Sequence, residues 1–215
     1  MSISVMLMQL IKGLGVTAEI FFLTLIFSLP LGLLVSFGRM SKNALVRTIS
    51  KIYISIMRGT PLMLQLIVVY FAPFYVFGLK IPNYRFPAII IAFALNYAAY
   101  FAEIYRSGIE SMPAGQYEAA KVLGYTKAQT FMRIILPQVI KRILPPVTNE
   151  TITLVKDTSL AFVLAQAEMF TMGKQIAAKE TSIMPLMAAG LFYYIFNLIV
   201  AFAMERLEKA LNYYR

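Results

Sequence analysis

Residues 13–37 read GLGVTAEIFFLTLIFSLPLGLLVSF, a run in which Glu19 is the one charged side chain. A helix needs about 20 mainly apolar residues to cross a hydrocarbon core of roughly 30 Å. This run therefore predicts a helix that spans a membrane. The residues before it lack the basic region and the small-residue cleavage site of a signal peptide, so we expect the run to be retained as a span.

Four further apolar stretches extend this prediction to the whole chain. Of the 215 residues, 60% are hydrophobic and 14% charged, whereas a soluble domain is about 45–50% apolar and roughly a quarter charged. A soluble fold of this size would leave too much apolar surface in water. We therefore expect an all-α fold, a polytopic transmembrane bundle of about five spans that forms a single domain over residues 1–215. The predicted spans are residues 13–37, 52–76, 86–106, 145–170 and 184–204.

Three prolines fall inside the predicted spans: Pro30 in the first, and Pro61 and Pro73 in the second. Each proline removes a backbone donor, so each is expected to kink or break its helix. A break of this kind is tolerated in a membrane where the freed backbone groups are shielded from lipid.

The basic residues predict the orientation of the spans. Twelve lysines and arginines lie between the first and second spans, between the third and fourth, and after the fifth, whereas five lie on the opposite side. Basic loops stay in the cytoplasm. We therefore expect the N-terminus outside and the C-terminus in the cytoplasm. The net charge of +10 is then a topology signal, and we expect membrane lipid and no nucleic acid as a partner.

The residue types that most enzymes and metal sites require are missing from the sequence. It contains no cysteine and no histidine, which excludes thiolate nucleophiles and the commonest general base and metal ligand. No segment fits the phosphate-binding pattern G-x4-G-K-[ST]. We therefore expect no catalytic residue, no metal and no cofactor in this chain, which is not itself an enzyme.

The segment 109–144 is too polar to span a membrane and too regular to be a simple linker. Pro113 suits the first turn of a short helix, which Gly124 would end in a left-handed conformation. Thr126 opens a capping box for a second helix, which we expect to stop at Pro137. A solvated connector would look similar. A DNA-binding helix-turn-helix is disfavoured, because both flanks enter the membrane within a few residues.

A pattern in this loop points to a more specific interpretation. Its residues follow EAA-x3-G-x9-I-x-L-P without gaps, and the loop therefore resembles the cytoplasmic EAA loop of permease subunits of ATP-binding-cassette importers. In that family the loop forms a short coupling helix that docks on a separate ATPase subunit. The matching residues are Glu118, Ala119, Ala120, Gly124, Ile134, Leu136 and Pro137.

The resemblance covers nearly the whole chain. Residues 58–62 (RGTPL), 102–106 (AEIYR) and 156–160 (KDTSL) are similar to the polar amino-acid branch of that family, which comprises permeases for histidine, arginine, glutamine, glutamate and related compounds. The resemblance implies a multi-pass protein of the bacterial cytoplasmic (inner) membrane that moves amino acids by alternating access. It also implies two copies of a cytoplasmic ATP-binding subunit that hold ATP and Mg²⁺, a second permease subunit, identical or related, and an extracytoplasmic amino-acid-binding protein.

Polar side chains inside the predicted spans mark a candidate substrate site. A charged group at bilayer depth costs about 2.5–3.5 kcal/mol on insertion scales and usually faces a cavity or a partner. The spacing of Asn96, Tyr100 and Glu103 places all three on one helix face. Glu150 and Asp157 are seven residues apart and thus nearly in line on the next span. Arg58 enters the second span directly before the Gly-Thr-Pro break and is added to this set. The candidate substrate-binding residues are therefore Arg58, Asn96, Tyr100, Glu103, Glu150 and Asp157.

These groups suit a zwitterion, because an α-amino acid offers a carboxylate for Arg58 or Lys156 and an ammonium for one of the acidic residues. The alternative is pairing within the protein, for instance of Glu103 with Arg106. Three acidic against two basic groups favour a basic amino acid as the substrate, although Arg106 would cancel this surplus if it reached the cavity. Glutamine, glutamate or another polar compound is the alternative substrate.

Two interpretations from other classes compete with the importer. A self-sufficient secondary transporter is disfavoured, because such proteins are built from internal repeats and no inverted repeat is visible here. A membrane scaffold without transport is disfavoured by the charged residues inside the predicted spans.

Overall fold

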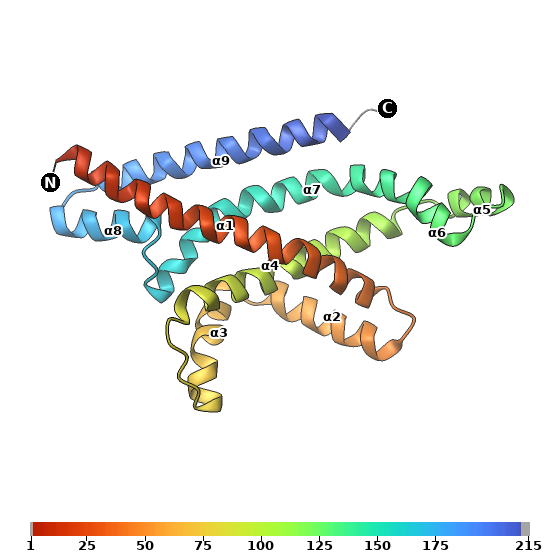
Figure 1. The fold of residues 1–215 in the computed structure, drawn as a ribbon, viewed down its shortest axis with the longest axis horizontal. Helices are drawn as coiled ribbons and strands as arrows, with labels where there is room; N and C mark the ends of the chain where they lie inside the picture. Colours follow the sequence, from red (N-terminus) through yellow and green to blue (C-terminus); the bar gives the residue numbers. More distant parts are fainter. Residues whose placement is uncertain (1, 212–215) are drawn as a thin grey trace.

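The computed structural model describes residues 2–211, whose regular structure is entirely helical (Figure 1). Two long helices, α1 (Ile3–Arg39) and α4 (Arg85–Glu110), pack along each other and form the centre of the bundle. The buried face of α1 is rich in small residues, which allow close helix contact. A Cβ atom at Gly32 would lie 2.9 Å from Phe101 Cβ and 3.0 Å from the Ala98 carbonyl oxygen, so the two backbones meet there.

The membrane-spanning helices match the prediction in part. By length and composition, three helices of the described chain can each cross a membrane: α1, α4 and α9 (Met184–Leu211). The second predicted span is broken into α2 (Ala44–Gly59) and α3 (Leu62–Phe77), which differ in direction by 112°. If this pair counts as one span, the number rises to four.

The fourth predicted span, residues 145–170, is wrong as a single helix. Helix α7 (Leu136–Asp157) begins earlier, contains both Pro145 and Pro146, and is followed by a 3-10 turn at Thr158–Leu164. The chain then breaks at Ala165, where φ is +52°, before α8 (Met169–Glu180) begins. Helix α8 starts there because the Glu168 carboxylate accepts hydrogen bonds from its first free N–H groups, those of Phe170 and Thr171.

The first half of the loop prediction is confirmed. Helix α5 (Ala114–Val122) follows Pro113, and Gly124 takes up the left-handed conformation with φ +79°. The expected capping box then starts α6 (Lys127–Thr130), with Thr126 Oγ1 accepting from the Gln129 N–H and Gln129 Oε1 accepting from the Thr126 N–H.

The predicted stop at Pro137 is wrong. The chain continues from α6 through a π-helical turn, Phe131–Ile135, directly into α7, in which Pro137 is the second residue. A wide π turn changes the pairing of the backbone groups just before the proline, where an α-helix would require the missing N–H. Of the other prolines, Pro61 lies at the break between α2 and α3, whereas Pro30 and Pro73 lie inside continuous helices.

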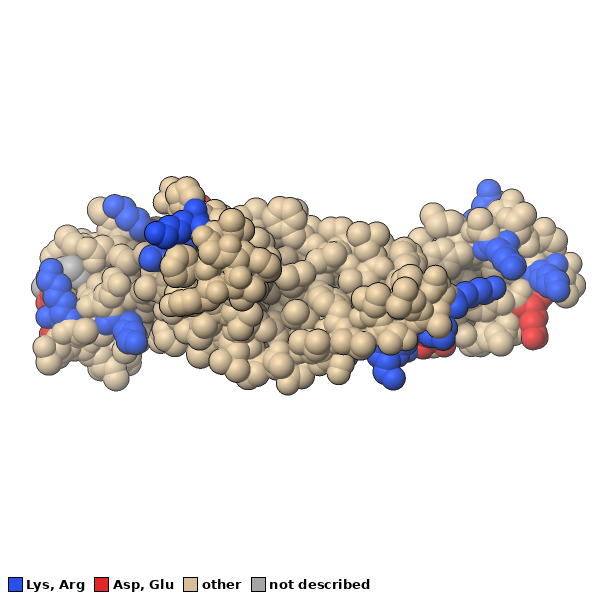
Figure 2. Space-filling view, turned by 90° about the horizontal axis from the view of Figure 1, so that it is seen from below, with Lys and Arg blue, Asp and Glu red and all other residues tan. Residues whose placement is uncertain are grey.

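The charged residues gather toward the two ends of the molecule. Figure 2 shows Lys and Arg near both ends of one face, with a broad belt free of charged side chains between them. The N-terminus and α8 lie at one end, whereas α5, α6 and the connection from α1 to α2 lie at the other (Figure 1). This arrangement is compatible with the predicted orientation, which stays a prediction.

The close contact of α1 with α4 gives a first test. The Gly32→Leu substitution should lower the unfolding free energy in detergent by about 1–3 kcal/mol, because the added side chain meets backbone and not empty space. Gly15→Leu is the matched control, since a Cβ on that residue of the same helix has no neighbour within 4 Å. Thermal melting followed by circular dichroism compares the two, and equal melting temperatures would refute the close contact.

Candidate functional site

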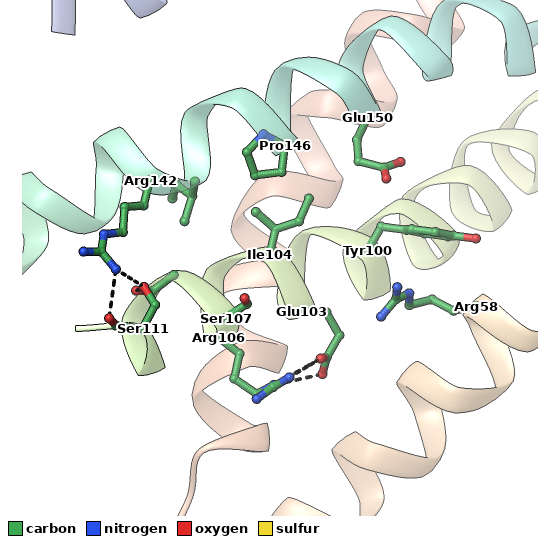
Figure 3. Close-up of a pocket in the computed structure, with 12 residues that line it drawn as sticks. Arg58, Tyr100, Glu103, Ile104, Arg106, Ser107, Ser111, Arg142, Pro146 and Glu150 are labelled. Atoms are coloured by element: carbon green, nitrogen blue, oxygen red, sulfur yellow. Dashed lines mark hydrogen bonds and ion pairs between the residues drawn. The ribbon is translucent and has the colours of Figure 1, made fainter. Parts of the chain in front are cut away.

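A cavity of about 580 Å³ lies between α4, α7 and the end of α2 (Figure 3). It brings together residues that are up to 92 positions apart in the sequence, from Arg58 to Glu150. Four of the six candidate substrate-binding residues line it. The lining residues are Arg58, Tyr100, Glu103, Ile104, Arg106, Ser107, Gly108, Ser111, Arg142, Ile143, Pro146 and Glu150.

Two of the charged groups in the cavity neutralise each other. Arg106 Nη2 lies 2.6 Å from Glu103 Oε2, and Arg106 also contacts Glu110 one turn further along α4. Arg39 Nε of α1 lies 3.8 Å from Glu103 Oε1. The pairing that the sequence offered as an alternative for Glu103 is therefore present, although Glu103 still lines the cavity.

A third cation, Arg142, is held by the protein as well. Its Nη1 donates to the Ser111 carbonyl oxygen at 2.8 Å and to Ser111 Oγ at 3.0 Å. Arg142 was not among the predicted site residues. The signal for it was available, since Arg142, Pro146 and Glu150 are spaced by four and share one face of α7.

Of the five charged side chains that line the cavity, Arg58, Arg142 and Glu150 have no ion-pair partner within residues 2–211, and of these three only Arg142 is hydrogen-bonded to the protein. The Arg58 guanidinium lies over the Tyr100 ring, 5.2 Å from its centroid. Figure 3 shows the Arg58 and Glu150 side chains on either side of Tyr100. A cation and an anion that face one cavity from opposite walls provide complementary sites for a small dipolar ligand.

The other two candidate residues lie outside the cavity lining. Asp157 accepts a hydrogen bond from the hydroxyl of Tyr97 at 2.7 Å. The Asn96 amide donates to Gln65 Oε1 at 2.9 Å and to the Met57 carbonyl oxygen at 3.0 Å. Neither Tyr97 nor Gln65 was predicted, because helical spacing identifies a shared face but not the neighbour that meets it.

The charge balance differs from the sequence-based expectation. Three arginines and two glutamates line the cavity, so the small acidic surplus that favoured a basic substrate is absent. Arg106, identified as the residue that would cancel the surplus, does reach the cavity. In the part of the chain that the structure describes, no group of three or more Asp or Glu side chains could hold a metal ion.

Comparison with known protein families gives one match that covers most of the chain. Residues 28–213 match the family described as binding-protein-dependent transport system inner membrane component. Among individual relatives, an L-cystine transport system permease of Bacillus subtilis is 36% identical over 205 residues, covering 94% of this chain and 86% of the relative. An arginine transport system permease of the same organism is 36% identical over 204 residues, covering 94% and 92%.

A solved structure has the same fold over nearly its full length. The crystal structure of an amino acid ABC transporter with histidines contains a chain that is 32% identical, with a TM-score of 0.85. The match covers 94% of each chain. The overall helical arrangement is therefore shared with a chain of an amino acid transporter.

The contact between Tyr97 and Asp157 gives a second test. Tyr97→Phe should lower the unfolding free energy by about 1–3 kcal/mol, because the Asp157 carboxylate loses the donor that compensates its partial burial. Tyr194→Phe removes the same hydroxyl from an exposed position of α9 and should have no effect. Equal melting temperatures for the two variants in detergent would show that this hydrogen bond does not stabilise the bundle.

Proposed function

The chain belongs to the family of binding-protein-dependent transport system inner membrane components, and on this basis we propose that it is the membrane subunit of an ATP-driven importer of polar L-amino acids. The observation that carries the proposal is the pair of opposite charges, Arg58 and Glu150, that face one cavity between the helices and have no ion-pair or hydrogen-bond partner within residues 2–211. Both relatives described above are named for the transport of an amino acid.

The two charges fit the groups that all α-amino acids share. Arg58 would bind the carboxylate, since a guanidinium presents two parallel donors to a carboxylate. Glu150 would accept hydrogen bonds from the ammonium. Tyr100 would form the wall between them, and Glu103, already neutralised by Arg106, would face the polar side chain of the substrate. Because the acidic surplus is absent, we propose no preference for a basic amino acid.

The loop at one end of the molecule suits docking on a second protein. Val122 and Leu123 at the end of α5 are exposed, at 87% and 73%, although both are apolar and lie outside the apolar helices. Exposed apolar residues of this kind, in a loop that resembles a docking loop, support a protein contact here. The resemblance to the EAA loop supports the ATP-binding subunit as the partner at this contact, and that subunit would be present in two copies and hold ATP and Mg²⁺.

We also propose the remaining partners of this chain, of which the binding protein is supported by the family description. A binding-protein-dependent system requires an extracytoplasmic protein that delivers the amino acid. A second permease subunit, identical or related, would close the pathway, because few helices of this chain surround the cavity. The complex would lie in a bacterial cytoplasmic membrane, with the C-terminus on the cytoplasmic side.

Uptake by proteoliposomes tests the function directly. The vesicles contain this chain with its ATP-binding subunit, and labelled arginine, histidine, lysine, glutamine, glutamate and cystine are offered with the delivering binding protein. We expect ATP-dependent uptake of at least one of them. Uptake without ATP or without the ATP-binding subunit would favour a self-sufficient transporter and overturn the proposal.

The same assay tests the two site residues. Arg58→Gln and Glu150→Gln should each lower uptake at limiting amino-acid concentration by about tenfold or more, the effect of losing one hydrogen bond between charged groups. Lys51→Gln and Glu19→Gln are matched controls, because these exposed charges lie on α2 and α1 away from the cavity. Unchanged uptake in both cavity variants would remove Arg58 and Glu150 from the site.

A further variant tests the coupling loop. Gly124→Val should weaken the binding of the ATP-binding subunit, because a β-branched residue is strained at φ +79° and the end of α5 would shift. Gly115→Val, inside α5 where φ is not positive, is the control. Both variants should still insert in the membrane. Normal co-purification and ATP hydrolysis of the Gly124→Val complex would contradict the assignment of the loop.

A further inference from the structure

The break between α2 and α3 leaves a particular carbonyl group without its helical partner. In a continuous helix, the N–H of residue 61 would donate to the carbonyl oxygen of residue 57. Residue 61 is Pro61, which has no N–H, so the Met57 carbonyl loses this bond. An unsatisfied carbonyl inside a membrane protein costs several kcal/mol unless another donor replaces the lost one.

Two buried side-chain amides supply the missing donors. Gln65 Nε2, on α3, donates to the Met57 carbonyl oxygen at 3.0 Å and also reaches Thr60 Oγ1 at 2.8 Å and the Thr60 carbonyl oxygen at 3.2 Å. Asn96 Nδ2, on α4, donates to the same Met57 oxygen at 3.0 Å and to Gln65 Oε1 at 2.9 Å. Both amides are buried, with exposed fractions of 9% for Gln65 and 4% for Asn96.

The carbonyl that these amides hold directly precedes Arg58. The Arg58 guanidinium lies over the ring of Tyr100, which is one helical turn beyond Asn96 on α4. Helix α4 therefore contacts the α2 break twice, once at the Met57 backbone and once at the Arg58 side chain. The break, and with it the direction in which residue 58 enters the cavity, is fixed against α4 by side-chain hydrogen bonds.

We propose that Gln65 and Asn96 are positioning residues, which hold the chain break at Met57 so that Arg58 faces the cavity. They act through Arg58 and do not touch the substrate, since neither lines the cavity and both Asn96 N–H groups are already donated to protein oxygens. The role of Arg58 as a carboxylate-binding residue rests on the function proposed above. The positioning itself is a property of the chain and is testable without transport.

The absence of cysteine from the sequence permits a direct measurement. Arg58→Cys places one thiol at the position in question, and Ser107→Cys places one on α4 in the same cavity. Each reporter is combined with Asn96→Leu or with Gln65→Met in the complex with the ATP-binding subunit. The rate of modification by a small cationic methanethiosulfonate reagent is measured in detergent, where both sides of the protein are accessible.

Asn197→Leu is the control for replacing an asparagine amide with a leucine side chain elsewhere in the bundle. Asn197 lies on α9, and its Oδ1 atom is buried without a hydrogen-bond partner in the described structure. We expect Asn96→Leu and Gln65→Met to change the modification rate of the thiol at position 58 by about two- to tenfold, the effect of losing one hydrogen bond. The thiol at position 107 should react at an unchanged rate in every background, and Asn197→Leu should affect neither reporter.

Two outcomes would overturn the proposal. An unchanged rate at position 58 would show that the amides do not position it, and equal changes at positions 58 and 107 would show a general loosening of the bundle. If Asn96→Leu does not fold, Gln65→Met, which nearly preserves side-chain volume, decides the question. If the modification rate at position 58 changes as expected but no uptake is observed, the transport function is rejected and the positioning role is retained.

Discussion

Every backbone N–H and C=O group inside a lipid bilayer needs a partner within the protein, and this constraint governs where the chain can depart from a helix. At the first interruption, between Gly59 and Leu62, the amides of Gln65 and Asn96 replace the bond that Pro61 removes. At the second, before α8, Glu168 accepts from two N–H groups, and Thr17 of α1 accepts from the Met169 N–H at 3.2 Å. Each interruption is thereby fixed to other side chains.

Helix α4 connects the hydrogen bonds at the first interruption to the cavity. One of its faces packs closely on α1 through alanines and Gly32, while its polar residues face α2, α3 and α7. Asn96 holds the break, Tyr97 donates to Asp157, and Tyr100 and Glu103 line the cavity in successive turns. The polar side chains of a single helix thus contact α2, α3 and α7.

The sequence predicted the features that depend on local chemistry. The capping box at Thr126, the left-handed Gly124 and the apolar helices α1, α4 and α9 depend only on residues near them, and the structure contains them. The break after residue 157 and the passage through Pro137 depend on Glu168 and on a π turn, which periodicity does not reveal. Within the site, the spacing on α4 correctly grouped Tyr100 with Glu103. It could not show that Asn96 meets Gln65, since that contact joins residues 31 positions apart.

The state of the cavity charges bears on how the proposed importer would select its substrates. Glu103 neutralises Arg106, and Ser111 holds Arg142, so these groups are already stabilised by contacts within the protein. Binding them to a ligand would first require breaking those contacts. Arg58 and Glu150 form no ion pair or hydrogen bond within the described residues, so a ligand would have fewer contacts to break, and the groups they suit are the carboxylate and ammonium common to all α-amino acids. In the proposed importer this pair would therefore recognise an amino acid as a class, and discrimination between side chains would come from the remaining cavity walls or from the proposed protein that delivers the substrate.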